Sequence, residues 1–376
     1  MDLDYLNISI HLMNKLTVSL ALYSKGEAKY LPYLFDSLKK QTFQDWELLI
    51  VDNAADGDVI SVAEGFAKEM GRSYRILHSD TNEGFAKAHN KAYRVSDAAY
   101  FLMLNPDMYL EPTVFADMVS FLDEQKDVAS VAPRLMRWDF AQVDASAKKQ
   151  QERDVAAKAG YTRDIDAIGV RLFRNRRAVE WLAQYTWEEA SASTDVQRLY
   201  EKTYVEVFGV SGALAMFRKK MIDTLLLPED AIFDPTYGSY KEDLDLAYRM
   251  RNAGFTSYVL LKSVAYHDRT GAAPKKHTDV AAIKNKRRQS PYIRFHSYKN
   301  HLRTLYKNEY WQNVLRDLPF IFWYEAKKFG FILFTDPRTI FLGWFEILKH
   351  VGYTRRARKA IVKSRKMYWK GLRRWF

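Results

Sequence analysis

The stretch TVSLALYSKGEAKYLPYLFDSLKKQTFQDWELLIVDN, residues 17–53, decides the fold that we expect. It begins with a mostly apolar run over 17–22, continues with apolar residues at helical spacing over 30–41, and ends with a second apolar run over 46–51. The short runs predict buried strands, and the spacing between them predicts a helix. A strand, a helix and a strand joined by short connections are typical of a mostly parallel sheet with helices packed on it.

The same alternation continues over the first 270 residues, so we expect an α/β fold with a mostly parallel sheet flanked by helices. Only residues 138–206 depart from it; they are looser and more polar, and we interpret them as an insertion. The further elements that we expect are a helix from about 59, a strand at 74–77, a helix at 86–95, a strand at 99–104, a glycine-containing strand at 205–217, a helix at 244–252 and a strand at 258–266.

Composition and charge divide the chain into two parts. The 376 residues exceed the roughly 250–300 at which one core usually stops growing, so about two folded units are expected. Residues 271–376 hold 25 Lys and Arg against 6 Asp and Glu, whereas residues 1–270 hold 33 against 40. We therefore predict a boundary at about 270–290, after which a basic, aromatic, helical region follows. The chain has no cysteine, which excludes disulfides, thiolate metal sites and thiol catalysis.

Polar clusters follow the predicted strands, where open parallel sheets bind their ligands. They are Asp52-Asn53, the segment 82–90, Asn105-Pro106-Asp107 and Glu242-Asp243. Neither a G-x-G-x-x-G turn after the first strand nor a G-x-x-x-x-G-K-[ST] loop is present, which argues against a dinucleotide dehydrogenase and a P-loop ATPase. The lack of a glycine-rich loop after the first strand also disfavours a sugar nucleotidyltransferase.

Four segments carry a resemblance to a known family: residues 17–58, NEGFAKAHNKA at 82–92, LNPDMYL at 104–110, and FDPTYGSYKEDLDLAYRMRNAGF at 233–255. In this order they resemble bacterial family-2 inverting glycosyltransferases of the GT-A fold, and most of all the rhamnosyltransferase-like members. The resemblance implies transfer of a sugar from a nucleoside diphosphate to a hydroxyl of a cell-surface glycan or a polyprenyl-diphosphate-linked acceptor. L-Rhamnose from dTDP-rhamnose is the favoured donor, and a UDP-hexose is the nearest competitor.

The resemblance also implies a divalent metal site. Mg²⁺ or Mn²⁺ would bind oxygen ligands there and stabilise the negative charge of a leaving diphosphate. Asp107 stands where the family has the last carboxylate of its D-x-D motif, whereas Asn105 replaces the first carboxylate and removes one charge. His267 follows a predicted strand, at a point where relatives place a histidine near metal or phosphate. The plainer interpretations are a strand end with a helix cap at 105–107 and a histidine that is simply hydrogen-bonded.

Further residues are assigned to the donor by the same resemblance. Asp52 and Asn53 would contact the nucleoside, although ordinary turn chemistry also explains them. Gly84 would let the backbone approach the donor, and Lys87 or Asn90 would meet phosphate or sugar. A solvated helix face is an equally good interpretation of Lys87.

The catalytic base is expected in the pair Glu242-Asp243. Ser239 and Glu242 fit the S-x-x-E pattern of a capping box, which would leave Asp243 free as the base. It would accept the proton of the acceptor hydroxyl as that oxygen attacks the anomeric carbon opposite the diphosphate, inverting its configuration. We place acceptor recognition in the insertion at 138–206, including Asp166 and Gly169, and expect segment 208–213 near the donor sugar and acceptor.

The basic C-terminal region holds three uncharged apolar runs, at 318–324, 329–335 and 339–345. Each is too short to span a bilayer, and they suit helices lying on an anionic membrane surface. With no signal pattern at the N-terminus, we expect a cytoplasmic protein, peripheral on the inner face of the cell membrane. The alternatives are aromatic residues packing on the catalytic part or on a second copy, as a homodimer, and a non-catalytic membrane scaffold. Nucleic acid is not an expected partner, because no nucleic-acid module is visible.

Overall fold

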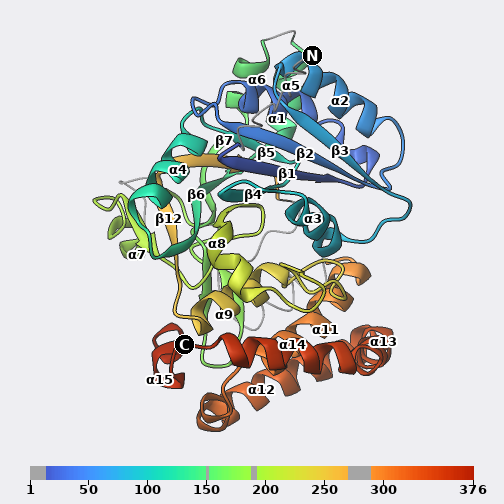
Figure 1. Cartoon of the computed structure of the whole chain (residues 1–376), viewed down its shortest axis with the longest axis vertical. Coiled ribbons are helices and arrows are strands. Elements are labelled where there is room, and N and C mark those ends of the chain that lie inside the picture. Colours follow the sequence, from blue (N-terminus) through green and yellow to red (C-terminus); the bar gives the residue numbers. More distant parts are fainter. Residues whose placement is uncertain (1–13, 150–151, 188–192, 270–288) are drawn as a thin grey trace, which may run out of the picture.

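The computed structural model describes residues 14–149, 152–187, 193–269 and 289–376. Its centre is one curled, mixed sheet with helices on both faces (Figure 1). The strands are β1 (Leu16–Leu22), β2 (Trp46–Asn53), β3 (Tyr74–Ser79), β4 (Tyr100–Leu104), β5 (Met108–Leu110), β6 (Val128–Trp138), β7 (Tyr161–Ala167), β8 (Val170–Leu172), β9 (Ala178–Glu180), β10 (Tyr204–Glu206), β11 (Leu214–Arg218) and β12 (Thr256–His267).

The helices of the sheet-containing part lie mainly between these strands. The α-helices are α1 (Leu31–Lys39), α2 (Val59–Met70), α3 (Phe85–Arg94), α4 (Val114–Glu124), α5 (Phe140–Ala147), α6 (Arg153–Ala159), α7 (Thr194–Gln197), α8 (Lys219–Ile222) and α9 (Glu242–Asn252), with the 3-10 helices η1 (Lys25–Glu27) and η2 (Asp223–Leu225). The C-terminal region consists of α11 (Pro291–Asn308), α12 (Trp311–Thr335), α13 (Pro337–Lys349), α14 (Val351–Ser364), α15 (Trp369–Leu372) and the 3-10 helix η3 (Arg373–Trp375).

The strand order in the main sheet is β10-β12-β6-β11-β4-β1-β2-β3, with β5 paired to β12 and β7 to β6. The strands β3, β2, β1 and β4 run parallel, as the alternation of 17–104 predicts. Strand β11 lies antiparallel between β4 and β6, and β6 pairs in parallel with β12. The expected α/β fold is therefore confirmed, with the uninterrupted parallel order confined to the N-terminal half.

Both faces of the sheet are covered, which explains why all seven residues of β1 are buried. The helices α1, α2 and α4 pack on one face, where Leu34, Ala63 and Phe115 belong to one apolar cluster. The helices α3 and α9 pack on the other face through a second cluster, which includes Tyr93 and Leu246.

The expectation of a single strand over 205–217 is wrong, because the structure has β10, a connection over 207–213, and β11. The connection contains Gly209, where an added Cβ would lie 2.3 Å from the Cβ of Ala247 in α9. The glycine thus serves a close approach to a helix, and the chain leaves the sheet to make it.

The C-terminal helices pack against the sheet-containing part through buried charges. The Lys307 ammonium in α11 lies 2.7 Å from an Asp234 carboxylate oxygen and 3.0 Å from one of Asp245, and all three side chains are fully buried. At the chain end, Trp375 packs edge-on against Phe208. The boundary predicted at 270–290 falls almost entirely outside the described residues.

Candidate active site

Strand pairing brings Asp107 beside His267. Residue Asp107 follows β4 and directly precedes β5, whose antiparallel pairing with β12 sets Met108 opposite His267. As a result, the His267 Nε2 atom lies 3.3 Å from Asp107 Oδ1, and the backbone N–H of Asp268 donates to the Asp107 carbonyl at 3.0 Å. Two of the residues predicted from sequence to bind metal are thus neighbours at one edge of the sheet.

The other ring nitrogen of His267 is held by Asp166, a buried residue on β7. The distance from Nδ1 to Asp166 Oδ2 is 2.8 Å. Burial alone would lower the pKa of His267, but the carboxylates of Asp107 and Asp166 raise it to about 9. The histidine is therefore positively charged at neutral pH when no other cation is bound, and its ring orientation is fixed from both sides.

A second ion pair continues this network. The Arg269 guanidinium lies 3.2 Å from Asp166 Oδ2 and 3.0 Å from Glu180 Oε1 at the end of β9. The Ser211 hydroxyl lies 3.1 Å from both Glu180 and Arg269. Burial raises the pKa of Glu180, and the nearby charge of Asp243 raises it further. No motif in the sequence indicates Glu180 or Arg269. Glu180 lies far from the other site residues along the chain, and Arg269 follows His267 by two residues without belonging to a pattern that assigns it a role.

The N-terminus of α9 lacks the side-chain cap that the sequence predicts. The capping box of Ser239 and Glu242 is wrong: Lys241 precedes the helix with φ +73°, and its side chain makes no cap hydrogen bond. Glu242 instead points into the protein, with its Oε2 atom lacking a hydrogen-bond partner among the described residues. Burial, followed by the charge of Asp243, raises the pKa of Glu242 to about 8.

Asp243 is only partly buried and lies next to the glycine-containing connection 207–213. Its Oδ2 accepts from the backbone N–H of Gly212 at 3.3 Å, and its Oδ1 from that of Leu244 at 2.7 Å. A Cβ on Gly212 would lie 3.3 Å from the Asp243 Cβ, so a larger residue would crowd this carboxylate. An accessible carboxylate held by backbone donors is suited to accepting a proton.

The residues predicted to contact the donor nucleoside, Asp52 and Asn53, lie at the end of β2 and face the end of β3. Asp52 accepts from the Ala55 N–H at 3.0 Å, as in a turn, and its other oxygen lies 3.0 Å from His78 Nδ1. The Asn53 side chain bonds Asn82 at 3.0 Å and the Glu83 N–H at 2.9 Å, and so fixes the loop after β3. Nothing in these contacts assigns a ligand.

Residues of the segment 82–90 make contacts within the protein that stabilise the fold. Gly84 has φ +83°, and an added Cβ would lie 2.8 Å from backbone atoms of Gly238, so it permits contact between two loops. Asn90 is fully buried and uses both amide atoms to bond the backbone of Phe233. Lys87 is exposed, 3.4 Å from Glu83. Asn105 donates its backbone N–H to the Ala213 carbonyl at 2.9 Å, which ties the end of β4 to the connection 207–213.

The fit to a divalent metal rests on a small donor set. In the described ranges no three His, Asp or Glu side chains converge as a ready metal site. Asp107 Oδ1 and His267 Nε2 nevertheless face each other, and Asp166 orients the imidazole as second carboxylates orient metal-binding histidines. These two groups suit a cation that keeps waters or substrate phosphates as its other ligands, as Mg²⁺ usually does.

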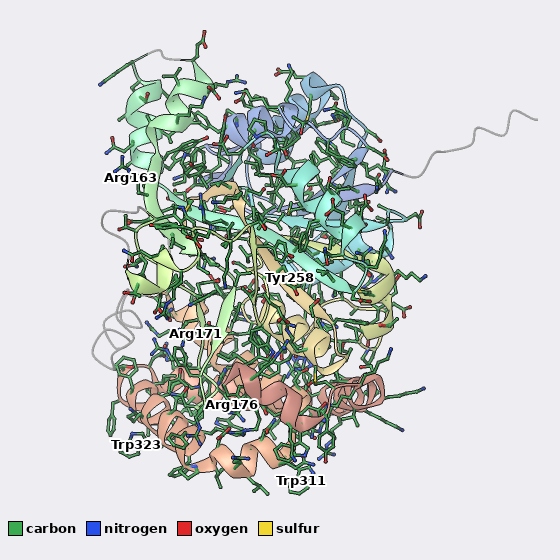
Figure 2. The ribbon with its side chains drawn as sticks, turned by 90° about the vertical axis from the view of Figure 1, so that its left-hand side faces the viewer. Arg163, Arg171, Arg176, Tyr258, Trp311 and Trp323 are labelled. Atoms are coloured by element: carbon green, nitrogen blue, oxygen red, sulfur yellow. The ribbon has the colours of Figure 1, made fainter. Side chains whose placement is uncertain are left out.

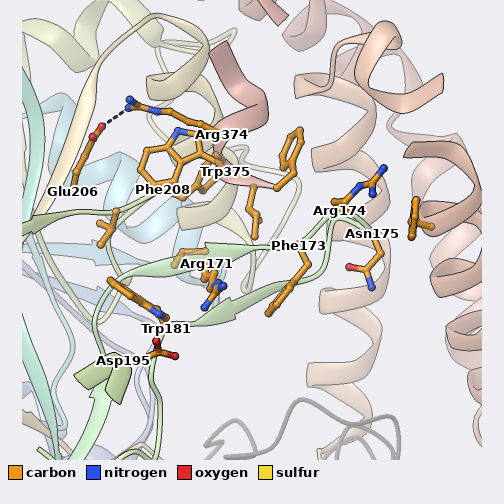
Figure 3. A pocket seen from close by; sticks show the side chains of 15 residues that line it. Arg171, Phe173, Arg174, Asn175, Trp181, Asp195, Glu206, Phe208, Arg374 and Trp375 are labelled. Carbon is orange, nitrogen blue, oxygen red and sulfur yellow. Dashed lines mark hydrogen bonds and ion pairs between the residues drawn. The ribbon is translucent and has the colours of Figure 1, made fainter. Parts of the chain in front are cut away.

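Two pockets lie outside this cluster. One of about 720 Å³ is bordered by the hairpin β8-β9, α12 and the chain end, and aromatic and arginine side chains point into it (Figure 3). Phe173, Trp181 and Trp375 are among its walls, and Trp181 directly follows Glu180. The other, of about 630 Å³, is lined by Lys87 and by residues of the C-terminal helices. Of the segments predicted to meet donor or acceptor, Phe208 from 208–213 lines the first pocket, and Lys87 and Asn82 from 82–90 line the second.

Comparisons with known proteins agree on the kind of domain. Residues 19–143 match the family model described as Glycosyl transferase family 2. Glycosyltransferases named for PGL/p-HBAD biosynthesis, from Mycobacterium bovis (strain BCG / Pasteur 1173P2) and Mycobacterium tuberculosis (strain ATCC 25618 / H37Rv), are each 29% identical over 109 residues. That match covers 29% of this chain and 42% of each relative, which is less than half of their length.

A solved structure supports the fold. The crystal structure of GalNAc-T7 with UDP, GalNAc and Mn²⁺ has a TM-score of 0.52 and 11% sequence identity, and the match covers 79% of this chain and 48% of that one. At this identity the likeness concerns the fold, which is the expected GT-A type. The family match supports a family-2 glycosyltransferase domain in the N-terminal part of the chain.

Proposed function

We propose that this protein is a glycosyltransferase that uses a nucleotide-sugar donor. The observation that carries the proposal is the meeting of Asp107, His267 and Asp166 at the strand ends, inside a domain whose first part matches family 2. Asp243 lies beside the same network through the Ser211-Gly212 backbone. The site therefore combines a place for a charged leaving group with a carboxylate that can take a proton.

In the proposed reaction Asp243 is the general base. An acceptor hydroxyl oxygen forms a bond to the anomeric carbon as the bond from that carbon to the diphosphate oxygen breaks, and the hydroxyl proton passes to Asp243. A single displacement of this kind inverts the anomeric configuration. The raised pKa of Glu242 keeps that neighbour mostly protonated at neutral pH, so Asp243 is the carboxylate of the pair that is free to act.

The leaving diphosphate gains negative charge during this step. Asp107 and His267 would hold a divalent cation there, with Asp166 fixing the imidazole. When bound, such a cation neutralises the developing charge. Asn105 contributes no charge to the site, so we assign the cation to Asp107 and His267 rather than to a pair of carboxylates.

The identities of the donor and the acceptor are further proposals. We propose dTDP-rhamnose as the donor, with a UDP-hexose next, on the sequence resemblance alone; Asp52 and Asn53 are the proposed nucleoside contacts, with Gly84 and Lys87 beside them. The acceptor would be a glycan or a polyprenyl-diphosphate-linked sugar. The pocket walled by Trp181 and Phe173 supports placing acceptor recognition in region 138–206, because Trp181 adjoins Glu180 at the catalytic network.

The test is the variant Asp243→Asn with donor turnover as the readout. We expect turnover to fall by about 10²–10⁴-fold, the usual range for a general base. Thermal stability and nucleotide affinity should stay close to wild type, because the side chain is partly exposed and the amide keeps a carbonyl acceptor for Gly212. The matched control is Asp127→Asn. Asp127 is an exposed aspartate that directly precedes the N-terminal end of β6.

Unchanged turnover in Asp243→Asn would remove Asp243 from the base role. A folded wild-type protein that binds nucleotide and turns over no donor would favour the scaffold alternative.

A further inference from the structure

The outer face of α12 is apolar and uncovered in the described structure. Five large apolar side chains recur at spacings of four, three, four and seven residues, which places them on one side of the helix. Each is between 40% and 68% exposed: Trp311, Leu315, Leu318, Phe322 and Phe329.

The next helix, α13, repeats this pattern. Its exposed stripe has the spacing i, i+3, i+4, i+7, with exposures between 47% and 70%, and consists of Phe341, Trp344, Phe345 and Leu348. The opposite side of α13 is buried, and a Cβ on Gly343 would lie 3.1 Å from the ring of Tyr298 in α11. Trp311 and Trp323 mark the outer edge of the helical end, remote from the sheet (Figure 2). We call the two stripes together the α12–α13 face.

The exposed charged side chains of the helical region 291–376 are all basic. None of the five acidic residues between 291 and 376 is exposed, because Glu309 and Asp317 are buried and the other three are half-buried. Eleven basic residues of the same region are exposed: Arg316, Lys327, Arg338, Lys349, Arg355, Arg356, Lys359, Lys363, Lys366, Lys370 and Arg374. Two of them are paired, Lys349 with Glu346 at 3.4 Å and Arg374 with Glu206 at 2.6 Å. The helical region thus joins exposed aromatic side chains to an excess of positive charge.

The face belongs to a fixed part of the fold. Arg176, from the turn between β8 and β9, bonds both Glu309 and Asp317, and all three side chains are buried. Asn300 in α11 donates to the carbonyls of Tyr237, Ser239 and Tyr240, directly before the carboxylates of α9. The inner sides of α11 and α12 therefore contact the sheet-containing part, and the apolar outer side has no contact of this kind among the described residues.

We propose that the α12–α13 face binds an anionic lipid bilayer, with its aromatic side chains inserted at the level of the headgroups. Apolar stripes on helices flanked by Lys and Arg are suited to lying in the plane of such a surface. None of the helices in the described ranges is long and apolar enough to cross a membrane. A second copy is the poorer occupant, because a two-fold interface would bring two patches of the same sign together.

The placement has a consequence for the proposed function, on which it rests. Because α11 holds the loop before Glu242 and Asp243, membrane binding would keep the site at a fixed height above the lipid surface, where a lipid-linked acceptor presents its sugar. Lipid binding itself does not depend on the enzyme being a glycosyltransferase, so the two proposals fail separately.

The test is co-sedimentation of the full chain with vesicles of phosphatidylcholine, alone or mixed with phosphatidylglycerol. We expect binding to the mixed vesicles to be at least about tenfold tighter and to weaken as salt is added. The double variant Phe322→Ser/Phe345→Ser should lose about tenfold or more of this affinity. Arg316→Glu/Arg338→Glu should lose the preference for phosphatidylglycerol. The control is Val155→Ser, an exposed apolar residue on α6, and should bind as wild type.

Sedimentation equilibrium without lipid separates the alternatives. The proposal is overturned if wild type stays in the supernatant with both vesicles, or if the double phenylalanine variant binds them as wild type does. It is also overturned if wild type is a dimer that this variant converts to a monomer while neither binds lipid, since the face would then belong to a second copy. Circular dichroism must show that each variant is folded, which the exposure of all five substituted side chains leads us to expect.

Discussion

At the residue scale, carboxyl groups within one site experience opposite surroundings. Asp166 is buried, yet Arg269 and His267 hold its pKa below the ordinary value. Glu242 is buried without a cation that bonds it, and its pKa rises to about 8. Environments that push the pKa values of neighbouring carboxyl groups apart in this way leave one group charged and the other neutral at the same pH. Asp166 therefore acts as a fixed anion that positions His267.

Glu242 provides a prediction on pH and stability. Its pKa is higher in the folded protein than the ordinary 4.5, so the folded state keeps a proton that the unfolded state has lost. The stability due to this group is present below about pH 4.5 and is lost as the pH rises toward 8. We expect Glu242→Gln, which mimics the protonated form, to raise Tm at pH 8 by about 3 °C and to change it little at pH 5. Thermal unfolding at both pH values is the measurement, and an equal change at both would contradict the buried proton.

The sequence led to the neighbours Asp107 and His267 through their places after predicted strands. It could not lead to Glu180 and Arg269, because their contacts depend on how the hairpin β8-β9 folds back over the sheet. The sequence indicates Asp166 only as a residue of the insertion 138–206, where we expect acceptor recognition. The structure places it behind His267, 2.8 Å from the ring, a contact that no sequence pattern indicates.

At the element scale, glycines set the distances between segments. Gly84 lets the start of α3 contact the loop at Gly238, and the Ala86 N–H donates to the Gly238 carbonyl at 2.9 Å. That loop leads to the α9 carboxylates. The sequence indicates Gly84 as a candidate for close approach to the donor, but it does not distinguish a glycine needed for packing from one needed for a ligand.

We expect Gly84→Ala to destabilise the protein by more than about 1 kcal/mol, because the residue has φ +83° and the new Cβ meets backbone. The control is Gly65→Ala in α2, where no atom lies within 4 Å of the added Cβ; this change should stabilise by up to about 1 kcal/mol. Urea unfolding of both variants measures the difference. Equal effects would show that the contact with Gly238 is not tight.

The junction of α11 with α9 gives a second prediction at this scale. Lys307 is the buried partner of both Asp234 and Asp245, and removing one member of a buried pair leaves a charge uncompensated. Lys307→Met should therefore lower the free energy of unfolding by about 3 kcal/mol in urea titration. Lys359→Met, exposed on α14, should change it by less than about 0.5 kcal/mol. A small effect at Lys307 would mean that Arg303 alone neutralises Asp234.

At the scale of the whole molecule, the basic region is part of the fold and not a loose appendage. Composition predicts a change of character near residue 270, because the charge balance reverses there. The buried pairs between Arg176 and Asp317 and between Lys307 and Asp234 have no sequence pattern, since each joins residues more than 70 positions apart. Removing the helices would leave these charges without partners, so surface variants are the sounder way to study the region.

The proposed function requires a nucleotide-sugar site at Asp107 and His267. Calorimetric titration of the wild type and of Asp107→Asn with dTDP and UDP, each with and without Mn²⁺, tests it most directly. We predict that Mn²⁺ strengthens wild-type binding of one nucleotide by at least about tenfold, and that Asp107→Asn loses this gain while remaining folded. A folded wild-type protein that binds neither nucleotide, with or without the metal, would contradict the account.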